Sequence, residues 1–234
     1  MHTISPARKA LSLALKLTVI LCTVTGTVMS ALAGRKAFMG GNRVFMYFTI
    51  QSNIAAALIS LIGCFLLMLK KPVKRGWYTV KLAGTVSITL TGAVFAVLLA
   101  PLLGKAAWNV PNTLTHLVVP LAAVADFFVS GKRCCLKRKT VFLGLLPPLA
   151  YAIYAGICYM KGWEFAKGQA YPYFFLNWGS PAGAFGFTDG FPLYGLRLVD
   201  NHPAAVPDHS GLWLCSFCQY DRKTPEEGRV KARL

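Results

Sequence analysis

The stretch WYTVKLAGTVSITLTGAVFAVLLAPLL, residues 77–103, decides the fold. Lys81 is the one charged side chain in it. A helix needs about 20 mostly apolar residues to cross a bilayer, so this stretch predicts a transmembrane helix. Four further stretches qualify by the same criterion, and together they predict an all-α, polytopic transmembrane bundle with spans at residues 10–33, 44–69, 77–103, 110–130 and 141–160. The first is too long for a signal peptide and has no clear cleavage site, so we expect a retained helix.

Composition agrees with this interpretation. Hydrophobic residues make up 55% of the 234 residues, the mean hydropathy is +0.51, and 14% are charged. An ordinary soluble domain has roughly 25% charged residues. These values exclude a soluble globular enzyme, a disordered chain and a secreted disulfide scaffold. The formal net charge of +17 would suggest nucleic acid in a soluble protein, but here the cations lie in short runs between apolar stretches, so we expect no nucleic-acid partner.

The connections between spans predict the orientation. Eleven cations lie on the side of the N-terminus, against six on the other side. Cytoplasmic loops carry the excess of Lys and Arg, so the pattern predicts a multi-pass protein of the plasma membrane with a cytoplasmic N-terminus. The eleven are Arg8, Lys9, Lys70, Lys71, Lys74, Arg75, Lys132, Arg133, Lys137, Arg138 and Lys139, and the six are Arg35, Lys36, Arg43, Lys105, Lys161 and Lys167.

The seven cysteines form no metal-binding pattern. Cys134 and Cys135 are adjacent in a basic loop, and Cys22, Cys64 and Cys158 lie in apolar runs, where cysteine commonly serves as a small apolar filler. We expect no disulfide framework, no metal and no cofactor.

The last segment differs from the rest. Residues 1–192 form the predicted transmembrane domain, with a loop rich in glycine and aromatic residues at 162–191, and residues 193–234 form a polar tail. Five of the eight acidic residues lie at Asp200 or later. A sixth span is expected after the loop but is missing from the sequence.

One hypothesis for the tail is a frameshift. Codons permitted by Tyr194 to Val206, read one base forward, can encode Met-Gly-Cys-Val-Trp-Trp-Ile-Ile and then a run of Leu or Phe. A genuine disordered tail is the alternative that composition permits. A frameshift would leave the tail's histidines and its Cys-x-x-Cys pair without function, namely His202, His209, Cys215 and Cys218.

Ionisable groups inside apolar spans are expensive and need a reason. Lys16 and Lys81 lie near the predicted cytoplasmic ends of their spans, so we expect their long side chains to extend to the membrane surface. Asp126 lies near the same surface, and we expect an ion pair with the basic loop that follows it.

His116 and Thr49 lie at similar predicted depths. Each is about five or six residues into its span, and both spans cross in the same direction, so both side chains lie about 8–9 Å below one surface. A hydroxyl and an imidazole at one depth permit nucleophilic catalysis, because the imidazole can accept the hydroxyl proton. No carboxylate completes a triad, since Asp126 lies about 15 Å further along the helix. The alternative is structural: His116 bonds across a helix interface, and Thr49 bonds its own backbone.

Three motifs in order resemble a known family. They are Tyr-Phe-Thr-Ile-Gln-Ser-Asn at residues 47–53, Asn112-x-x-x-His116-x-x-x-Pro120, and Tyr-Pro-Tyr-Phe-Phe-Leu at residues 171–176. They are similar to those of a bacterial family of six-span membrane proteins distantly related to the eukaryotic androgen-induced membrane proteins. The resemblance covers roughly residues 45–177 and implies a six-span fold, from which this sequence departs by lacking the sixth span.

The resemblance also implies an activity. The eukaryotic relatives hydrolyse fatty acid esters of hydroxy fatty acids with an intramembrane threonine and a histidine. By that resemblance Thr49 is the nucleophile and His116 its base, acting on a lipid ester that enters from the membrane. An oxyanion donor is needed as well. The candidates that bind substrate or the oxyanion are Asn53, Asn112, Gln51, Tyr171 and Tyr173.

Two other functions stay open. A transporter or channel subunit would show repeats, broken helices or paired intramembrane charges. Pro101, Pro120 and the pair at 147–148 can kink helices, but no paired charge is evident in the sequence. A scaffold that binds anionic lipids or a partner through the basic loops is the other alternative.

Overall fold

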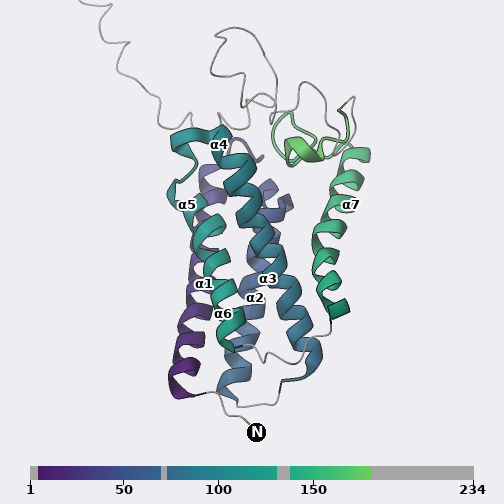
Figure 1. Ribbon diagram of the computed structural model, residues 1–234. Coiled ribbons are helices and arrows are strands. Elements are labelled where there is room, and N and C mark those ends of the chain that lie inside the picture. The colour runs from purple at the N-terminus through teal and green to yellow at the C-terminus, as the bar shows by residue number, and fades with distance from the viewer. Residues whose placement is uncertain (1–4, 70–72, 131–137, 181–234) are drawn as a thin grey trace, which may run out of the picture.

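A computed structural model describes residues 5–69, 73–130 and 138–180 of the chain, and these residues fold as an all-α bundle (Figure 1). The tail at 193–234, with the hypothesis of a frameshifted sixth span, and the Cys134-Cys135 pair lie outside the described residues. The helices are α1 (Pro6–Ala33), α2 (Phe48–Met68), α3 (Arg75–Val94), α4 (Ala100–Leu103), α5 (Val110–Thr113), α6 (Val119–Ser130) and α7 (Leu146–Met160). Shorter 3-10 and π segments are η1 (Asn42–Met46), η2 (Phe95–Leu99), η3 (Gly104–Ala106), η4 (Leu114–Val118), η5 (Arg138–Leu145) and η6 (Phe174–Leu176).

Within the described residues, five helical stretches are long and apolar enough to cross a membrane, which confirms the prediction of a multi-pass bundle. Their bounds are Pro6–Ala33, Phe48–Met68, Arg75–Ala106, Val110–Ser130 and Thr140–Met160. The predicted start of the second span at residue 44 was wrong. Residues 42–46 form the 3-10 turn η1, and the extended backbone of Tyr47 (φ −81°, ψ 139°) separates that turn from α2.

The bundle turns its apolar side chains outward, as a lipid-exposed protein does. Leu21 is 65% exposed, Phe128 72% and Met160 77%. The buried face of α1 carries small and polar residues instead, at the 3.6-residue spacing of one helix face. Small residues let helices approach closely in lipid, where burying leucine gains little. The residues on that buried face are Ser12, Lys16, Val19, Thr23, Gly26, Thr27 and Ser30.

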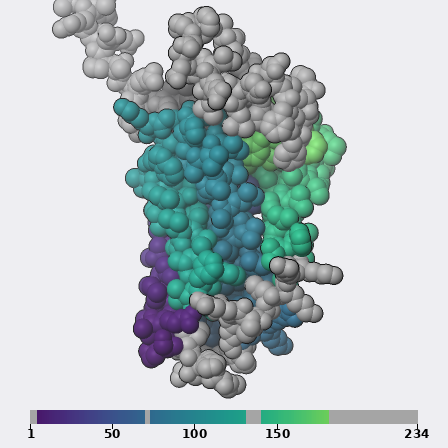
Figure 2. Space-filling model, in the orientation of Figure 1, coloured from purple at the N-terminus to yellow at the C-terminus, as the bar shows by residue number. Residues whose placement is uncertain are grey.

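Four of the spans form the body of the bundle. α1 packs against α2 and α6, and α3 packs against α2 and α6. α7 lies at the side of the bundle beside α3 (Figures 1 and 2). We call the end that holds α4, α5 and the segment at 161–180 the pocket end, and the end that holds the start of α1 the opposite end (Figure 1).

A buried charge cluster joins three of these helices toward the opposite end. Lys16 Nζ lies 2.5 Å from Asp126 Oδ1, and Lys81 Nζ lies 2.6 Å from Asp126 Oδ2. All three side chains are at most 7% exposed. The prediction that the lysines extend to the surface was therefore wrong. Among the described residues, the side-chain partners of Asp126 are these two lysines and Ser12, whereas most of the basic loop that was expected to pair with Asp126 lies outside the described residues. In a bilayer, an inward lysine paired with a carboxylate avoids an unpaired charge in lipid.

Candidate active site

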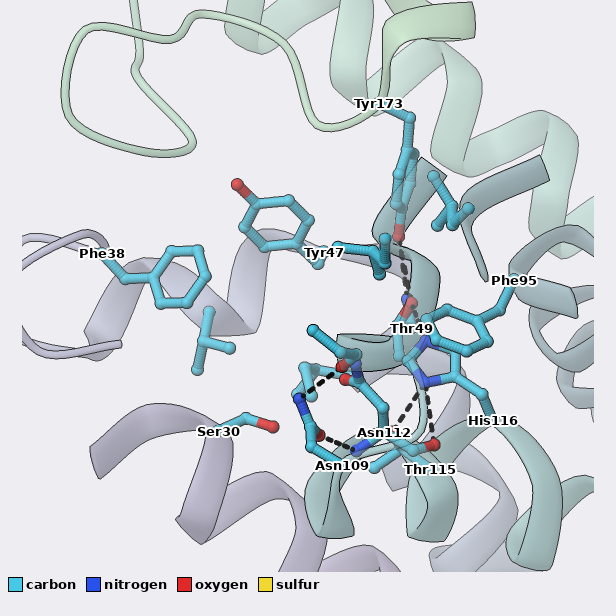
Figure 3. Close-up of a pocket in the computed structure, with 15 residues that line it drawn as sticks. Ser30, Phe38, Tyr47, Thr49, Phe95, Asn109, Asn112, Thr115, His116 and Tyr173 are labelled. Atoms are coloured by element: carbon cyan, nitrogen blue, oxygen red, sulfur yellow. Dashed lines mark hydrogen bonds between the residues drawn. The ribbon is translucent and has the colours of Figure 1, made fainter. Parts of the chain in front are cut away.

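A pocket opens at the pocket end of the bundle, with a cavity volume of about 80 Å³ (Figure 3). We call it the His116 pocket. The residues used below that line it are Ser30, Thr49, Phe95, Asn109, Asn112, Thr115, His116 and Tyr173.

Two π-turns lie on the walls of this pocket, and one residue separates each of them from a proline. In η2 the Ala100 N–H donates to the Phe95 carbonyl, and in η4 the Val119 N–H donates to the Leu114 carbonyl. Pro101 and Pro120 follow directly. A proline ring collides with the carbonyl four residues earlier, and the wider turn relieves that collision. The second π-turn carries His116.

The two π-turns hold the imidazole against an aromatic ring. The rings of Phe95 and His116 stack, with centroids 3.9 Å apart and an interplanar angle of 24°. Each ring lies on a π-turn of a different span. Both residues line the pocket.

Two glycines let neighbouring helices approach the His116 segment. A Cβ on Gly92 in α3 would lie 2.8 Å from the His116 carbonyl oxygen. A Cβ on Gly26 in α1 would lie 2.7 Å from Thr115 Cγ2. Both distances are shorter than van der Waals contact permits, so only glycine fits at these positions without displacing the His116 segment.

Hydrogen bonds assign the tautomer of His116. Its Nδ1 lies 3.1 Å from the Asn112 carbonyl oxygen and 3.0 Å from Thr115 Oγ1 (Figure 3). The Thr115 hydroxyl donates its proton to the Pro111 carbonyl, so its oxygen accepts from His116. Nδ1 therefore carries the proton, and Nε2 is an acceptor. A backbone carbonyl and a hydroxyl thus fix the tautomer and the orientation of this imidazole, which is one part of what a carboxylate does in a catalytic triad, and neither supplies the negative charge that stabilises an imidazolium.

Nε2 faces the Thr49 hydroxyl. Thr49 Oγ1 lies 3.4 Å from His116 Nε2, so the structure brings together the two residues that the sequence placed at one depth (Figure 3). Thr49 lies in the first turn of α2 rather than five residues into a helix. Thr49 and His116 still lie at one depth in the bundle, because η1 and Tyr47 take up the residues that were predicted as the first turn of this helix.

The position of Thr49 explains why its hydroxyl is available. Other threonines of the bundle donate to the carbonyl four residues earlier, as do Thr18, Thr85, Thr89, Thr91 and Thr115. At the start of α2 no helical turn precedes Thr49, and the Phe45 carbonyl accepts from Gln51. Among the described residues the partners of Thr49 Oγ1 are His116 and Tyr173.

Tyr173 comes from the segment beyond α7 and completes the cluster. Its hydroxyl lies 3.2 Å from Thr49 Oγ1 and accepts a 3.2 Å hydrogen bond from the Thr49 backbone N–H. That N–H is one of the donors left unpaired at a helix start. With one proton per hydroxyl, the chain of donors runs from Tyr173 to Thr49 to Nε2. Burial raises the pKa of the Tyr173 hydroxyl more than its hydrogen bonds to Thr49 lower it, so this donor stays protonated.

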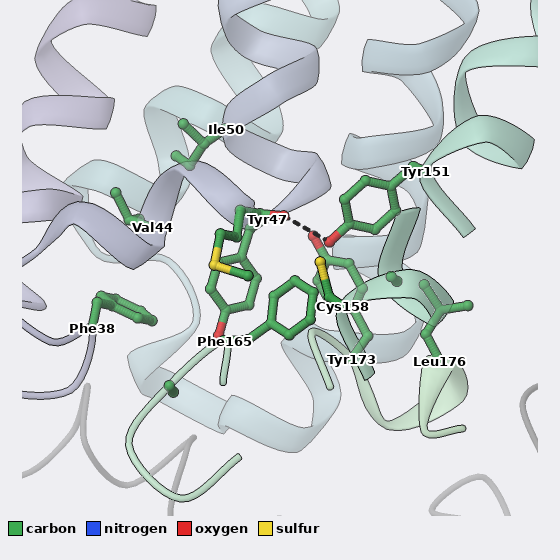
Figure 4. Close-up of a cluster of buried hydrophobic side chains, with 12 residues drawn as sticks. Phe38, Val44, Tyr47, Ile50, Tyr151, Cys158, Phe165, Tyr173 and Leu176 are labelled. Carbon is green, nitrogen blue, oxygen red and sulfur yellow. Dashed lines mark hydrogen bonds between the residues drawn. The ribbon is translucent and has the colours of Figure 1, made fainter. Parts of the chain in front are cut away.

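An aromatic cluster fixes Tyr173 in place (Figure 4). Its ring stacks on Phe175 with centroids 5.2 Å apart and an interplanar angle of 3°, and it meets Tyr47 edge-on at 6.0 Å. The Tyr151 hydroxyl donates to the Met46 carbonyl and ties α7 to η1. The segment at 161–180 is therefore packed against the start of α2 by rings on both sides.

The other predicted candidates divide into two groups. Asn112 lines the His116 pocket with Tyr173, whereas Gln51, Asn53 and Tyr171 line neither pocket described here. Gln51 is exposed and donates to backbone carbonyls. Asn53 is fully buried, and its amide donates to the Thr49 and Thr115 carbonyls, so it ties the backbone of the threonine to that of the His116 segment.

A second pocket adjoins the first, between α3, α7 and the 173–176 segment, with a cavity volume of about 130 Å³. We call it the α3–α7 pocket. Thr49, Leu99 and Tyr173 line both pockets, whereas His116 lines only the first. The sequence did not predict this pocket or the roles of Phe95 and Gly92. Pro101 and Pro120, each of which follows one of the two π-turns, are the sequence signal that accompanies these turns.

The chain matches no protein-family model, no curated protein and no solved structure. The chemistry of the site therefore rests on its own geometry.

Proposed function

We propose that this chain is an integral-membrane hydrolase of lipid esters, of the type that cleaves fatty acid esters of hydroxy fatty acids, with Thr49 as nucleophile and His116 as its general base. The 3.4 Å separation of Thr49 Oγ1 from a His116 Nε2 whose tautomer makes it an acceptor carries the proposal. An unprotonated imidazole nitrogen facing a hydroxyl is the arrangement that nucleophilic catalysis by a weak alcohol requires.

The steps follow from the donors and acceptors. Thr49 Oγ1 attacks the ester carbonyl carbon while its proton passes to His116 Nε2. In the resting site the Tyr173 O–H donates to Thr49 Oγ1. As Oγ1 bonds to the ester carbon, this O–H turns to the oxyanion and donates a hydrogen bond to it. The start of α2 adds the positive end of a helix dipole beside this charge. Collapse of the intermediate expels the alcohol with the proton from Nε2. A water deprotonated by His116 then attacks the acyl-threonine, and the bond to Thr49 Oγ1 breaks as that oxygen regains the proton from Nε2, which releases the fatty acid.

The setting suits a lipid substrate. Both pockets are lined mainly by apolar side chains, and Leu90 on the wall of the α3–α7 pocket is 38% exposed on the lipid-facing surface. Trp163 and Trp178 near the pocket end are 47% and 41% exposed. Exposed tryptophan rings favour the headgroup region of a membrane, which is consistent with a pocket that opens near that region. The resemblance of the three sequence motifs to a bacterial six-span family supports the same activity.

We further propose that the protein lies in the plasma membrane with its N-terminus in the cytoplasm, on the distribution of the cations. The pocket end then faces away from the cytoplasm, and membrane lipids of the outer leaflet are the partners from which an ester substrate comes.

The test combines a probe with an assay. Purified protein in detergent is treated with a fluorophosphonate probe and, separately, with long-chain esters of hydroxy fatty acids. Thr49→Ala and His116→Gln are expected to abolish labelling and to lower hydrolysis by at least about 10³-fold. Thr89→Ala is the matched control, because Thr89 is an exposed threonine of α3 that bonds its own helix. Full hydrolysis in either site variant refutes the proposal.

The alternative function is a non-catalytic one, that of a transporter subunit, and one observation favours it. The Lys16–Asp126–Lys81 cluster is the paired intramembrane charge that such proteins use. Neither pocket described above is lined by these residues, which favours a structural role for the cluster. Wild-type protein without esterase activity, together with substrate flux in proteoliposomes that Asp126→Asn abolishes, would support the transporter.

A further inference from the structure

The two pockets meet at the nucleophile, and they differ in what they offer a substrate. Thr49 and Tyr173 belong to both walls, whereas His116 belongs to the first pocket alone. An ester has two arms, one on the carbonyl carbon and one on the leaving oxygen. With the carbonyl carbon at Thr49 and the carbonyl oxygen at Tyr173, each arm has one pocket to occupy.

The proton transfer decides which arm goes where. The leaving oxygen receives its proton from His116 Nε2, so it lies on the His116 side of Thr49. The alcohol arm therefore extends into the His116 pocket, and the acyl arm extends the other way. We propose that the α3–α7 pocket binds the acyl chain of the substrate and that the His116 pocket binds the leaving alcohol, an assignment that rests on the proposed function.

The linings of the two pockets agree with this assignment. In the α3–α7 pocket the Thr91 hydroxyl bonds within the bundle to Ser87 and Ser52, and the Tyr151 hydroxyl donates to Met46. Apart from the shared Thr49 and Tyr173, the remaining lining is apolar and suits a hydrocarbon chain. Its residues are Phe48, Leu90, Val94, Leu99, Pro148, Ala152, Phe175 and Leu176.

The His116 pocket is different, because Ser30, Asn109 and Asn112 line it beside its apolar residues. The Asn109 side chain holds the start of α5, since its Oδ1 accepts from the Asn112 N–H and its amide donates to the Ala106 carbonyl, and the Asn112 amide donates to the Ala107 carbonyl. The Ser30 hydroxyl and Asn112 Oδ1 can bond polar groups on the alcohol, such as a second hydroxyl. Once the alcohol has left the His116 pocket, water can reach His116 Nε2 through the same space. The balance is one water consumed, one alcohol released through the His116 pocket, and one fatty acid released from the α3–α7 pocket.

Two alanines, both half-buried, provide a matched pair for the test. Ala152 lines only the α3–α7 pocket, and Ala106 lines only the His116 pocket. Two ester series are assayed, one with a fixed alcohol and acyl chains of increasing length, and one with a fixed short acyl group and alcohols of increasing length. Ala152→Phe is expected to lower kcat/KM for long acyl chains relative to short ones by about tenfold or more, with the alcohol series unchanged. Ala106→Phe is expected to do the reverse.

The opposite pattern, in which Ala152→Phe alters the alcohol series and Ala106→Phe the acyl series, overturns the assignment. Equal effects of both variants on both series overturn it as well, because they show one undivided pocket. Ala152→Leu is a smaller substitution that guards against a disturbance of α7 by the phenylalanine ring. It is expected to lower kcat/KM for long acyl chains in the same direction but by less.

A second measurement needs no turnover. A long-chain fatty acid with a diazirine near the methyl end is photo-crosslinked to the wild-type protein and to Thr49→Ala, and the adducts are mapped by peptide mass spectrometry. The expected adducts lie on α3 and α7, at residues 90–94 and 148–152, and unlabelled fatty acid competes with them. Adducts on residues 103–116, or no competed adduct, overturn the assignment. If the protein crosslinks the fatty acid on α7 but has no esterase activity, the proposed hydrolase function is refuted and the acyl-chain site is not.

Discussion

Gly92 in α3 lies directly against the backbone carbonyl of His116, and a Cβ at position 92 would come within 2.8 Å of that oxygen. The same Cβ would lie 3.2 Å from Pro120 Cγ, so the proline whose ring widens the π-turn also packs here. The close approach of α3 thus sets where the imidazole stands.

Substitution of Gly92 is therefore expected to move the histidine. Gly92→Ala should lower ester hydrolysis by about tenfold to a hundredfold, because a displacement of about 1 Å in a catalytic group has costs of that order. Gly76→Ala, at the exposed start of the same helix with no atom within 4 Å of its added Cβ, should leave activity unchanged. Equal activity of the two variants would contradict this account of the packing.

Tyr173→Phe is expected to lower kcat by about 10²-fold with little change in KM, because the hydroxyl acts on charge that develops only after attack. Tyr159→Phe, on the exposed side of α7, is the matched control. A loss confined to KM would mean that Tyr173 binds substrate and does not stabilise the oxyanion.

The pH dependence follows from the same hydroxyl. Burial raises the pKa of Tyr173 above the ordinary tyrosine value of about 10, so the O–H donor is present at all lower pH values and is lost only above it. We expect the kcat profiles of the wild-type protein and Tyr173→Phe to have the same shape up to about pH 10. An alkaline decline near pH 9 in the wild-type profile alone would be inconsistent with this.

Thr115→Val removes one of the two acceptors at His116 Nδ1 while keeping the shape of the side chain. We expect ester hydrolysis to fall about tenfold, because the loss of a group that orients a functional imidazole commonly lowers activity by about 10- to 100-fold. The loss is at the low end of this range because the Asn112 carbonyl still accepts from Nδ1. Thr113→Val, two residues earlier with its exposed hydroxyl bonded to the Trp108 carbonyl, is the control. Thermal unfolding of both variants separates loss of orientation from loss of fold.

The charge cluster predicts an order of stabilities. Asp126→Asn leaves Lys16 and Lys81 without a carboxylate and should cost about 3–5 kcal/mol of unfolding free energy. Lys16→Met leaves Asp126 paired with Lys81 and should cost less, while Lys105→Met, an exposed cation, should cost almost nothing. Thermal unfolding in one detergent ranks the three, and Lys16→Met as the least stable would contradict the pairing.

Much of the bundle could be predicted because its determinants are local. The apolar runs mark the five spans, and the parity of the spans places Thr49 and His116 at one depth. The direction of Lys16 could not be predicted, because reaching the surface and pairing with Asp126 use the same flexible side chain and differ only in the tertiary partner. The role of Tyr173 depends on how the segment beyond α7 folds back, which no periodicity encodes.

The π-turns lie between these cases. The sequence predicts kinks at Pro101 and Pro120. The structure has instead two widened turns, and the stacking of Phe95 on His116 depends on the two spans facing each other. Either proline alone would not have indicated the stacked rings.

The Lys–Asp–Lys cluster also constrains the order of assembly. The ribosome delivers the first and third helices, each with an ammonium group, before it has made the aspartate, which lies 110 residues after the first lysine and 45 after the second. Early translocation intermediates must keep both amines hydrated or near the membrane surface until the fourth span emerges. Closure of the bundle is therefore a late event in biogenesis, and truncated nascent chains that stop before that span should remain extractable or prone to degradation.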